Sequence, residues 1–345
     1  MAPTPQQILI TGGAGFIGSN LANRAIAAGH GVTILDDLSR AGSEHNVAWL
    51  RSQHGDLFRL IVADVADQHA CLEPVAQADV VYHLAGQTAI TTSLVEPRRD
   101  FMANALGTLN VLEAARAARR PPILIHASTN KVYGGMPDLS TTEQATRHVF
   151  RDLPCGVDES RPLDFHSPYG CSKGAADQYV RDYARIYGIP AVVFRQSCIY
   201  GPRQMGKEDQ GWLAWFAIAI ALDRPITVYG DGKQVRDALY VDDLIDAYEQ
   251  AVDRIDIARG QVYNIGGGVQ NSISVWWEFK PLLEEAFGRT LPEPAFAPGR
   301  PGDQAVFIAD VRKAQRELGW APRTSVAAGV DRLVAWVMDH RSLFT

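Results

Sequence analysis

Short apolar runs alternate with longer amphipathic segments up to about residue 200. The apolar runs have the length of buried strands and lie at 8–11, 32–35, 58–62, 79–84, 123–129 and 191–195. Between them the spacing of apolar residues is helical, most clearly at 98–118 and 167–187. Alternating strands and helices predict a parallel sheet with right-handed crossovers and helices on both faces.

The pattern is less regular beyond residue 200. Short strands are expected at 226–229 and 261–264, and a long loop over 136–168. Helical spacing recurs near 210–221, 243–254, 275–286 and 325–338. We therefore expect an α/β fold in which residues 1–200 form a doubly wound parallel sheet. Residues 201–345 form a smaller mixed C-terminal substrate lobe, with elements partly interleaved with the first domain.

A glycine-rich turn joins the first strand to the first helix. Gly12, Gly15 and Gly18 recur at steps of three, and Phe16 and Ile17 lie between the last two. Such a turn lets bare backbone approach a pyrophosphate, and the N-terminus of the following helix favours anions. The spacing therefore predicts a dinucleotide site of the Rossmann type over these five residues.

The second strand ends in an acidic residue, Asp36. A carboxylate at this distance from the turn accepts hydrogen bonds from the adenosine ribose hydroxyls and repels a 2′-phosphate, which favours NAD over NADP. Ser39 and Arg40 are expected beside the same ribose. Two alternatives remain open: Asp36 could cap the following loop, and Arg40 could pair with a 2′-phosphate.

Further small or polar residues follow the other predicted strands. Ligands on such sheets lie at the carboxyl ends of the strands, so these residues are expected to contact the cofactor. They are Asp64, Val65, Leu84, Ala85, Gly86 and Ser128, with Asn104 on a following helix.

Tyr169 and Lys173 lie four residues apart on the helix predicted from Ser167-Pro168, a favourable N-cap and first-turn pair. Residues at this spacing share one helical face. A cation beside a phenol favours the phenolate, so the pair suits a general base. The spacing alone also arises by chance on surface helices.

The overall composition is that of a globular protein. The net charge of −6 gives no reason to expect nucleic acid or a membrane as a partner. The first strand begins near Gln7, which leaves no room for a signal peptide, and no apolar run has membrane-spanning length, so a cytoplasmic location is expected. The four cysteines are expected to be free thiols, and no metal-ligand spacing is present, so no metal is expected.

Together these motifs resemble the extended short-chain dehydrogenase/reductase family. The resemblance rests on the glycine turn, Asp36, Ser128-Thr129 before Val132-Tyr133-Gly134, and the Tyr169/Lys173 pair, and it covers the chain from Ile8 to about Asp339. Within the family, the segments 128–134, 164–179, 209–212 and 232–237 resemble the CDP-paratose 2-epimerases (CDP-tyvelose epimerases). That subfamily uses tightly bound NAD to invert C2 of a CDP-linked 3,6-dideoxyhexose.

The resemblance implies a role for each catalytic candidate. Tyr169 would be the base, Lys173 would lower its pKa and hold the nicotinamide ribose, and Thr129 would hydrogen-bond the reacting oxygen. Direct inversion of a carbinol carbon is hard because its C–H is not acidic. Oxidation gives a planar ketone, and if the ketose turns over in the site, the same hydride returns to the opposite face and inverts the carbon. Thr129 could instead merely finish a strand.

The 4,6-dehydratases of the family carry Asp-Glu directly after this Thr, whereas this chain has Asn130-Lys131. An amide and an ammonium cannot supply that acid and base, so dehydration is disfavoured. Asn130 is assigned to the substrate site, and Arg236, Arg300 and Arg203 are candidates for binding the diphosphate, because a fork of donors suits phosphate oxygens. They could also be solvated or structural.

Three functions remain open at this point. A C2 epimerase of a CDP sugar is favoured, and an epimerase that acts at C4 or on a UDP sugar is the alternative, because the cofactor machinery is the same. A non-catalytic NAD-binding regulator is the third, although it would have no need of Thr129, Tyr169 and Lys173. The resemblance also implies a homodimer or homotetramer formed through the helices at 98–118 and 167–187.

Overall fold

The computed structural model describes residues 4–300 and 303–345 and divides the chain into two units. Unit 1 consists of residues 1–129, 167–195 and 248–263, and unit 2 consists of the remaining three segments. The expected boundary at residue 200 is therefore not where the units divide. The chain leaves unit 1 after Thr129, returns at Ser167 and leaves again after Arg195. The interleaving is more extensive than the sequence indicated.

Unit 1 is built on a seven-stranded sheet in the order β12-β8-β5-β4-β1-β2-β3. The pairings of β1 with β2 and β4, of β2 with β3 and of β4 with β5 are all parallel. The strands are β1 (Gln7–Thr11), β2 (Gly31–Asp36), β3 (Phe58–Val62), β4 (Val80–His83), β5 (Ile123–Thr129), β8 (Ala191–Gln196) and β12 (Val262–Ile265). The predicted doubly wound parallel sheet is confirmed.

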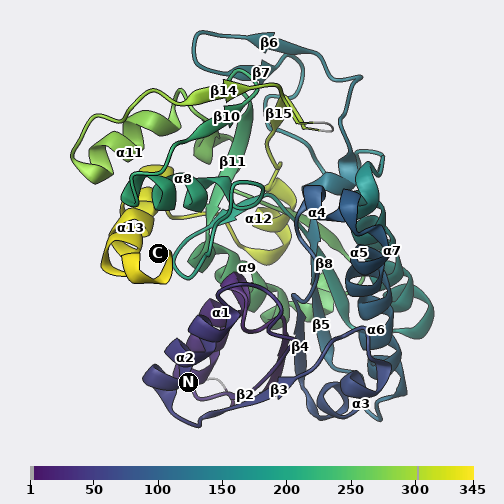
Figure 1. Ribbon diagram of the computed structural model, residues 1–345. Helices are drawn as coiled ribbons and strands as arrows, with labels where there is room; N and C mark the ends of the chain where they lie inside the picture. The colour runs from purple at the N-terminus through teal and green to yellow at the C-terminus, as the bar shows by residue number, and fades with distance from the viewer. Residues whose placement is uncertain (1–3, 301–302) are drawn as a thin grey trace. The chain divides into compact units, whose positions relative to one another are not determined.

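Helices cover both faces of this sheet (Figure 1). One face packs against α3, α6 and α7 through an apolar core that includes Val75, Val111 and Val180. On the other face Tyr248 of α9 lies against Tyr82 and Phe194, with ring centroids 5.6 and 5.4 Å away. The helices are α1 (Phe16–Ala27), α2 (Ser43–His54), α3 (Gln68–Gln77), α4 (Ile90–Val95), α5 (Pro97–Phe101), α6 (Gly107–Ala117), α7 (Ser167–Tyr187), α9 (Val241–Asp253, which begins in unit 2) and α10 (Ile255–Ala258).

The helix expected over 98–118 is interrupted. Between α5 and α6 the backbone forms one π-helical segment, η1 (Met102–Leu106), in which the N–H of Gly107 donates to the carbonyl of Met102. π-helical turns commonly occur at functional sites. Asn104 lies at the centre of this segment.

Unit 2 is a mixed assembly of short strands and helices. The strands β13, β11 and β15 form one sheet, with β9 also paired to β11, and β10 pairs with β14. The loop expected over 136–168 contains the hairpin β6–β7. The strands are β6 (Thr141–Glu143), β7 (His148–Phe150), β9 (Cys198–Tyr200), β10 (Thr227–Tyr229), β11 (Val235–Tyr240), β13 (Ser272–Ser274), β14 (Ala295–Ala297) and β15 (Val306–Phe307).

The helices of unit 2 include the predicted segments near 210–221, 275–286 and 325–338. They are η2 (Asn130–Tyr133), α8 (Trp212–Ala221), η3 (Val269–Asn271), α11 (Phe279–Phe287), α12 (Arg312–Leu318), α13 (Val326–Asp339) and η4 (Arg341–Leu343). The strand β11 was missed because it carries Arg236 and Asp237, yet all six of its residues are buried. Their main side-chain partners, Asp303 for Arg236 and Ser197 for Asp237, are distant in sequence, so the local pattern does not reveal them.

Candidate active site

The helix α7 brings Tyr169 and Lys173 to the carboxyl end of β5. The hydroxyl of Ser167 accepts a hydrogen bond from the N–H of Gly170 at 3.2 Å, as expected of an N-cap. The phenol of Tyr169 is hydrogen-bonded to the side chain of Thr129, the last residue of β5. Nζ of Lys173 donates to the carbonyl oxygen of Ala127 at 2.5 Å. The three predicted catalytic residues therefore lie together.

Burial dominates the electrostatics of this pair. It raises the pKa of Tyr169 to about 12, although the hydrogen bond with Thr129 acts in the opposite direction. It lowers the pKa of Lys173 to about 8, although Asp177 and Asp100 favour the ammonium. The expectation of a lowered Tyr169 pKa is therefore wrong for the protein by itself, because the loss of hydration disfavours the phenolate.

Ser128 was expected to contact the cofactor, but its hydroxyl donates to the carboxylate of Asp177 at 2.9 Å. The same carboxylate receives two hydrogen bonds from the guanidinium of Arg195, at 2.8 and 2.9 Å. All three side chains are at least 96% buried, since their exposed fractions are 4%, 0% and 2%. This cluster joins α7 to β5 and β8 and so fixes the helix that carries Tyr169.

The glycine turn is sterically required where β1 passes into α1. Gly12 has φ of 70°, and a Cβ there would lie 2.7 Å from the backbone nitrogen of Ala85. A Cβ on Gly18 would lie 2.3 Å from the carbonyl oxygen of Gly12. Gly15 is the N-cap of α1 and has no side-chain cap, so Phe16 and Ile17 begin the helix without one. A helix N-terminus of this kind is suited to an anion.

Asp36 closes the same turn from the end of β2. Its carboxylate accepts hydrogen bonds from the N–H of Ala14 at 3.0 Å and of Leu38 at 2.9 Å. Burial nevertheless raises its pKa. Ser39 and Arg40 are exposed; Ser39 binds Asp37, and Arg40 donates to Thr88 at 2.8 Å. A surface hollow beside this strand end is lined by residues 38–42, with Glu44 and His45.

The remaining cofactor candidates lie at the ends of β3 and β4. Asp64 is exposed and accepts from the N–H of Ala66 at 2.8 Å, whereas Val65 is buried in the core. Leu84 and Ala85 follow β4 and hydrogen-bond to Thr11. A Cβ on Gly86 would lie 2.5 Å from Oδ1 of Asn104. The parallel strand pairings thus bring the predicted segments to one edge of the sheet in unit 1.

Two of the predicted substrate residues in unit 2 are well buried. Asn130 is 7% exposed and begins η2, and Arg236 is 6% exposed on β11. Arg236 donates to Oδ1 of Asp303 at 2.5 Å, and Nζ of Lys131 lies 3.6 Å from the same oxygen. Burial opposes ionisation of Asp303, but these two cations keep its pKa below the usual value. Two cations around one carboxylate leave a net positive charge.

Arg203 and Arg300 lie in different surroundings within unit 2. The guanidinium of Arg203 lies 5.6 Å from the ring centroid of Trp336, and burial lowers its pKa. That of Arg300 lies 4.0 Å from the ring centroid of Tyr229 and donates to the carbonyl of Glu208 at 2.9 Å. Arg203 and Arg300 lie over aromatic rings, whereas Arg236 belongs to the charged cluster that it forms with Lys131 and Asp303.

Comparison with known proteins identifies relatives over nearly the whole chain. The profile of the family described as GDP-mannose 4,6-dehydratase matches residues 9–333. The CDP-paratose 2-epimerase of Salmonella typhi is 43% identical over 337 residues, which cover 96% of this chain and 98% of that protein. The UDP-glucose 4-epimerase of Mycolicibacterium smegmatis is 33% identical over 327 residues, covering 94% and 96%.

The chain belongs to the family described as GDP-mannose 4,6-dehydratase. Among solved structures, the UDP-glucuronic acid 4-epimerase of Bacillus cereus, in complex with UDP-glucuronic acid and NAD, has a TM-score of 0.81 at 28% identity and covers 96% of this chain and 99% of its own. The predicted membership of the extended short-chain dehydrogenases/reductases is confirmed. So are the predicted enzyme class, an NAD-dependent nucleotide-sugar epimerase, and the predicted cofactor.

The residues of the glycine turn fit the NAD of this family. Because Gly12 and Gly18 have no side chains, α1 begins tightly packed against the turn, and its N-terminus, which has no side-chain cap, is suited to a pyrophosphate. Oδ1 of Asn104 is buried beside Gly86 and accepts no hydrogen bond within the part of the chain that the structure describes. A buried acceptor of this kind needs a donor, which a ribose hydroxyl or the nicotinamide amide of bound NAD would supply.

The sequence did not single out Asp100, Ser172, Asp177 or Arg195, all of which are buried around the two family residues Tyr169 and Lys173. The spacing of Asp100 and Asn104 was the available signal, because i and i+4 share a helical face.

Among the described residues, no group of three or more His, Cys, Asp or Glu side chains could hold a metal ion, and no helix could span a membrane. All four cysteines are free.

Proposed function

We propose that this protein inverts C2 of a CDP-linked 3,6-dideoxyhexose, interconverting CDP-paratose and CDP-tyvelose through a transient 2-ketose. The observation that carries the proposal is the hydrogen bond between Tyr169 and Thr129, with Lys173 one turn further along α7. The 43% identity to a CDP-paratose 2-epimerase supports the choice of substrate. Bound NAD supplies the hydride acceptor and donor for the reaction.

The protein moves the hydroxyl proton. Oη of Tyr169 takes the proton of the reacting C2 hydroxyl and returns it after the ketose has turned over. Thr129 Oγ1 holds the reacting oxygen and stabilises the ionised phenol through its hydrogen bond. Because burial holds the pKa of Tyr169 near 12, the base requires positive charge around it. Lys173 supplies that charge as long as it stays protonated.

The cofactor would be held by the turn from Gly12 to Gly18, by Asp36 and by Asn104. Asp36 presents its two oxygens, each already receiving one backbone N–H, and a carboxylate can accept further bonds from ribose hydroxyls. The hollow lined by residues 38–42 adjoins it and would receive the adenosine.

The diphosphate would be bound by the positive cluster of unit 2. Arg236 presents a guanidinium fork, and Lys131 adds a second cation, so phosphate oxygens could replace Asp303 as their partner. Asn130, Arg203 and Arg300 are proposed to contact the rest of the nucleotide sugar. In Asn130-Lys131 the acid and base that a dehydratase needs are missing, so the epimerase reaction is favoured over loss of water.

The position of hydride removal tests the proposal. CDP-paratose deuterated at C2 is turned over in ordinary water by the protein as purified, without added NAD, and the product is analysed by NMR. We expect inversion at C2 with the deuterium retained there, since the hydride returns to its donor. Tyr169→Phe serves as the control for background exchange. Solvent hydrogen at C2 would indicate deprotonation, and inversion of a UDP sugar at C4 would move the protein to the alternative class.

A further inference from the structure

A buried carboxylate, Asp100, lies next to the turn of α7 that carries Tyr169 and Lys173. Asp100 belongs to α5 and is 1% exposed. One of its oxygens accepts a hydrogen bond from the hydroxyl of Ser172 at 2.5 Å, and the other accepts from Nδ2 of Asn104 at 3.2 Å. Nδ2 of Asn104 is also 3.0 Å from the Ser172 hydroxyl. The three side chains form a closed cluster that joins α5 and η1 to α7.

The charge of Asp100 has no ion-pair partner among residues 4–300 and 303–345. Burial accordingly raises its pKa, while the hydrogen bond from Ser172 and the charge of Lys173 favour the carboxylate. An unpaired buried charge is costly, so a carboxylate retained there needs a function. Lys173 directly follows Ser172, the hydrogen-bond partner of Asp100, and its charge favours the carboxylate form of Asp100.

Asp177 and Asp100 both favour the ammonium form of Lys173, and Asp177 has the larger effect. The carboxylate of Asp177 is paired with Arg195, whose guanidinium donates two hydrogen bonds to it. His83 and His126 are fully buried and their pKa values lie far below the ordinary value, chiefly because of desolvation, so both are neutral. Tyr169 is the remaining titratable group on the same face.

We propose that Asp100 is a positioning residue for the epimerase reaction: through Ser172 it fixes the first turns of α7, and its charge acts together with that of Asp177 to keep Lys173 in the ammonium form. This inference rests on the proposed roles of Tyr169 and Lys173. It places a negative charge beside α7, on α5, that acts on both members of the pair. Asp100 touches neither the substrate nor the cofactor in this role.

The direction of the effect follows from the sign of the charge. A carboxylate makes loss of a proton harder for any neighbouring group, and Asp100 raises the pKa of both Lys173 and Tyr169. Removing its charge should therefore lower both pKa values together. A residue that only held the helix in place would not produce two shifts of the same sign.

The test compares Asp100→Asn, which removes the charge and keeps the shape, with Ser172→Ala, which keeps the charge and removes the hydrogen bond. The NAD-loaded protein is titrated by tyrosinate absorbance, and Tyr169→Phe is subtracted to isolate Tyr169. We expect Asp100→Asn to lower the apparent pKa of Tyr169 by about one unit, and Ser172→Ala to change it by less than half as much. Asp100→Ser is a second charge-removing variant should the amide not fold.

The pH profile of turnover provides the second readout. In Asp100→Asn both limbs should move to lower pH, since the acid limb reports the base and the alkaline limb reports loss of the Lys173 proton. Two outcomes would overturn the inference. One is a pH profile of Asp100→Asn whose limbs do not move although its melting temperature falls. The other is an equal shift of the Tyr169 pKa in Asp100→Asn and Ser172→Ala. The absorbance titration needs no substrate, so a wrong assignment of the sugar would leave its result intact.

Discussion

Tyr169 and Lys173 have different tasks, and single substitutions should separate them. Tyr169→Phe removes the base and leaves the ring, so turnover should fall at least about a hundredfold while NAD stays bound. Lys173→Ala removes a cation proposed to serve both the phenol and the ribose, so both turnover and NAD content should fall. Turnover rates and the absorbance of bound NAD measure the two effects. Small and equal losses in both variants would mean that α7 is only scaffold.

The two adjacent residues at the end of β5, Ser128 and Thr129, have different partners on α7. Ser128 directly precedes Thr129, yet its hydroxyl is bound to Asp177, whereas the Thr129 side chain reaches Tyr169. Both side chains reach α7, so two adjacent residues at the end of β5 divide between anchoring the helix and contacting the proposed base. The buried pair of Asp177 and Arg195 makes that anchor firm, because breaking such a pair costs about 3–5 kcal/mol.

At the scale of elements, the contact between α1 and the preceding turn should be sensitive to a single methyl group. Gly18→Ala places a Cβ 2.3 Å from the carbonyl oxygen of Gly12. This oxygen belongs to the backbone, so it cannot move away without a loss of stability. We expect a loss of about 1–3 kcal/mol in stability and at least tenfold weaker NAD binding, because the turn must open. Thermal unfolding and NAD titration measure these changes.

Gly135→Ala is the matched control for this substitution. No heavy atom lies within 4 Å of its Cβ position, and its φ is not in the left-handed region. It should leave both quantities unchanged. If Gly18→Ala behaved like Gly135→Ala, the close packing of α1 on the turn would not be needed for the cofactor.

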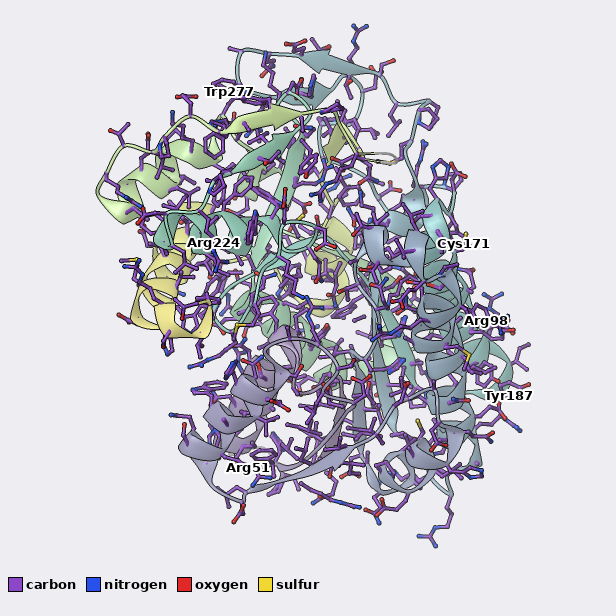
Figure 2. The ribbon with its side chains drawn as sticks, in the orientation of Figure 1. Arg51, Arg98, Cys171, Tyr187, Arg224 and Trp277 are labelled. Atoms are coloured by element: carbon purple, nitrogen blue, oxygen red, sulfur yellow. The ribbon has the colours of Figure 1, made fainter. Side chains whose placement is uncertain are left out.

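At the scale of the whole molecule, we propose a homodimer formed through the helices of unit 1. Exposed apolar side chains gather on α4, α5 and α7, and Figure 2 shows Tyr187 at the outer side of α7. The exposed residues are Leu94 (57%), Val95 (81%), Phe101 (56%), Ile186 (64%) and Tyr187 (50%). Exposed large apolar side chains of this kind can be buried in an interface between two copies, and the family resemblance implies a dimer through these helices.

Light scattering during gel filtration should give twice the mass of 37.7 kDa for the wild-type protein. Ile186→Glu should shift the protein towards the monomer, because a charge is then buried in the interface. Ile257→Glu is the control, since Ile257 on α10 is 52% exposed and lies outside these helices. A monomeric wild type, or equal dissociation in both variants, would exclude this interface.

The sequence by itself determined the elements whose signals are local. The strands at 58–62 and 123–129 and the helix at 167–187 have the predicted bounds, because apolar runs and helical periodicity depend only on neighbouring residues. The steps of the glycine turn and the four-residue spacing of Tyr169 and Lys173 are local as well. Parallel pairing then brings the strand ends together without further information.

Only the tertiary structure decided which buried charges meet. Ser172 and Asp100 are 72 residues apart, and Arg236 and Asp303 are 67 apart, so no periodicity links them. The sequence predicted neither the burial of Asp100 nor the strand β11. A charged side chain can be buried only when a distant partner satisfies it, and that partner is fixed by how the strands and helices pack. The environments of Tyr169 and Lys173, and with them their pKa values, therefore belong to the folded protein alone.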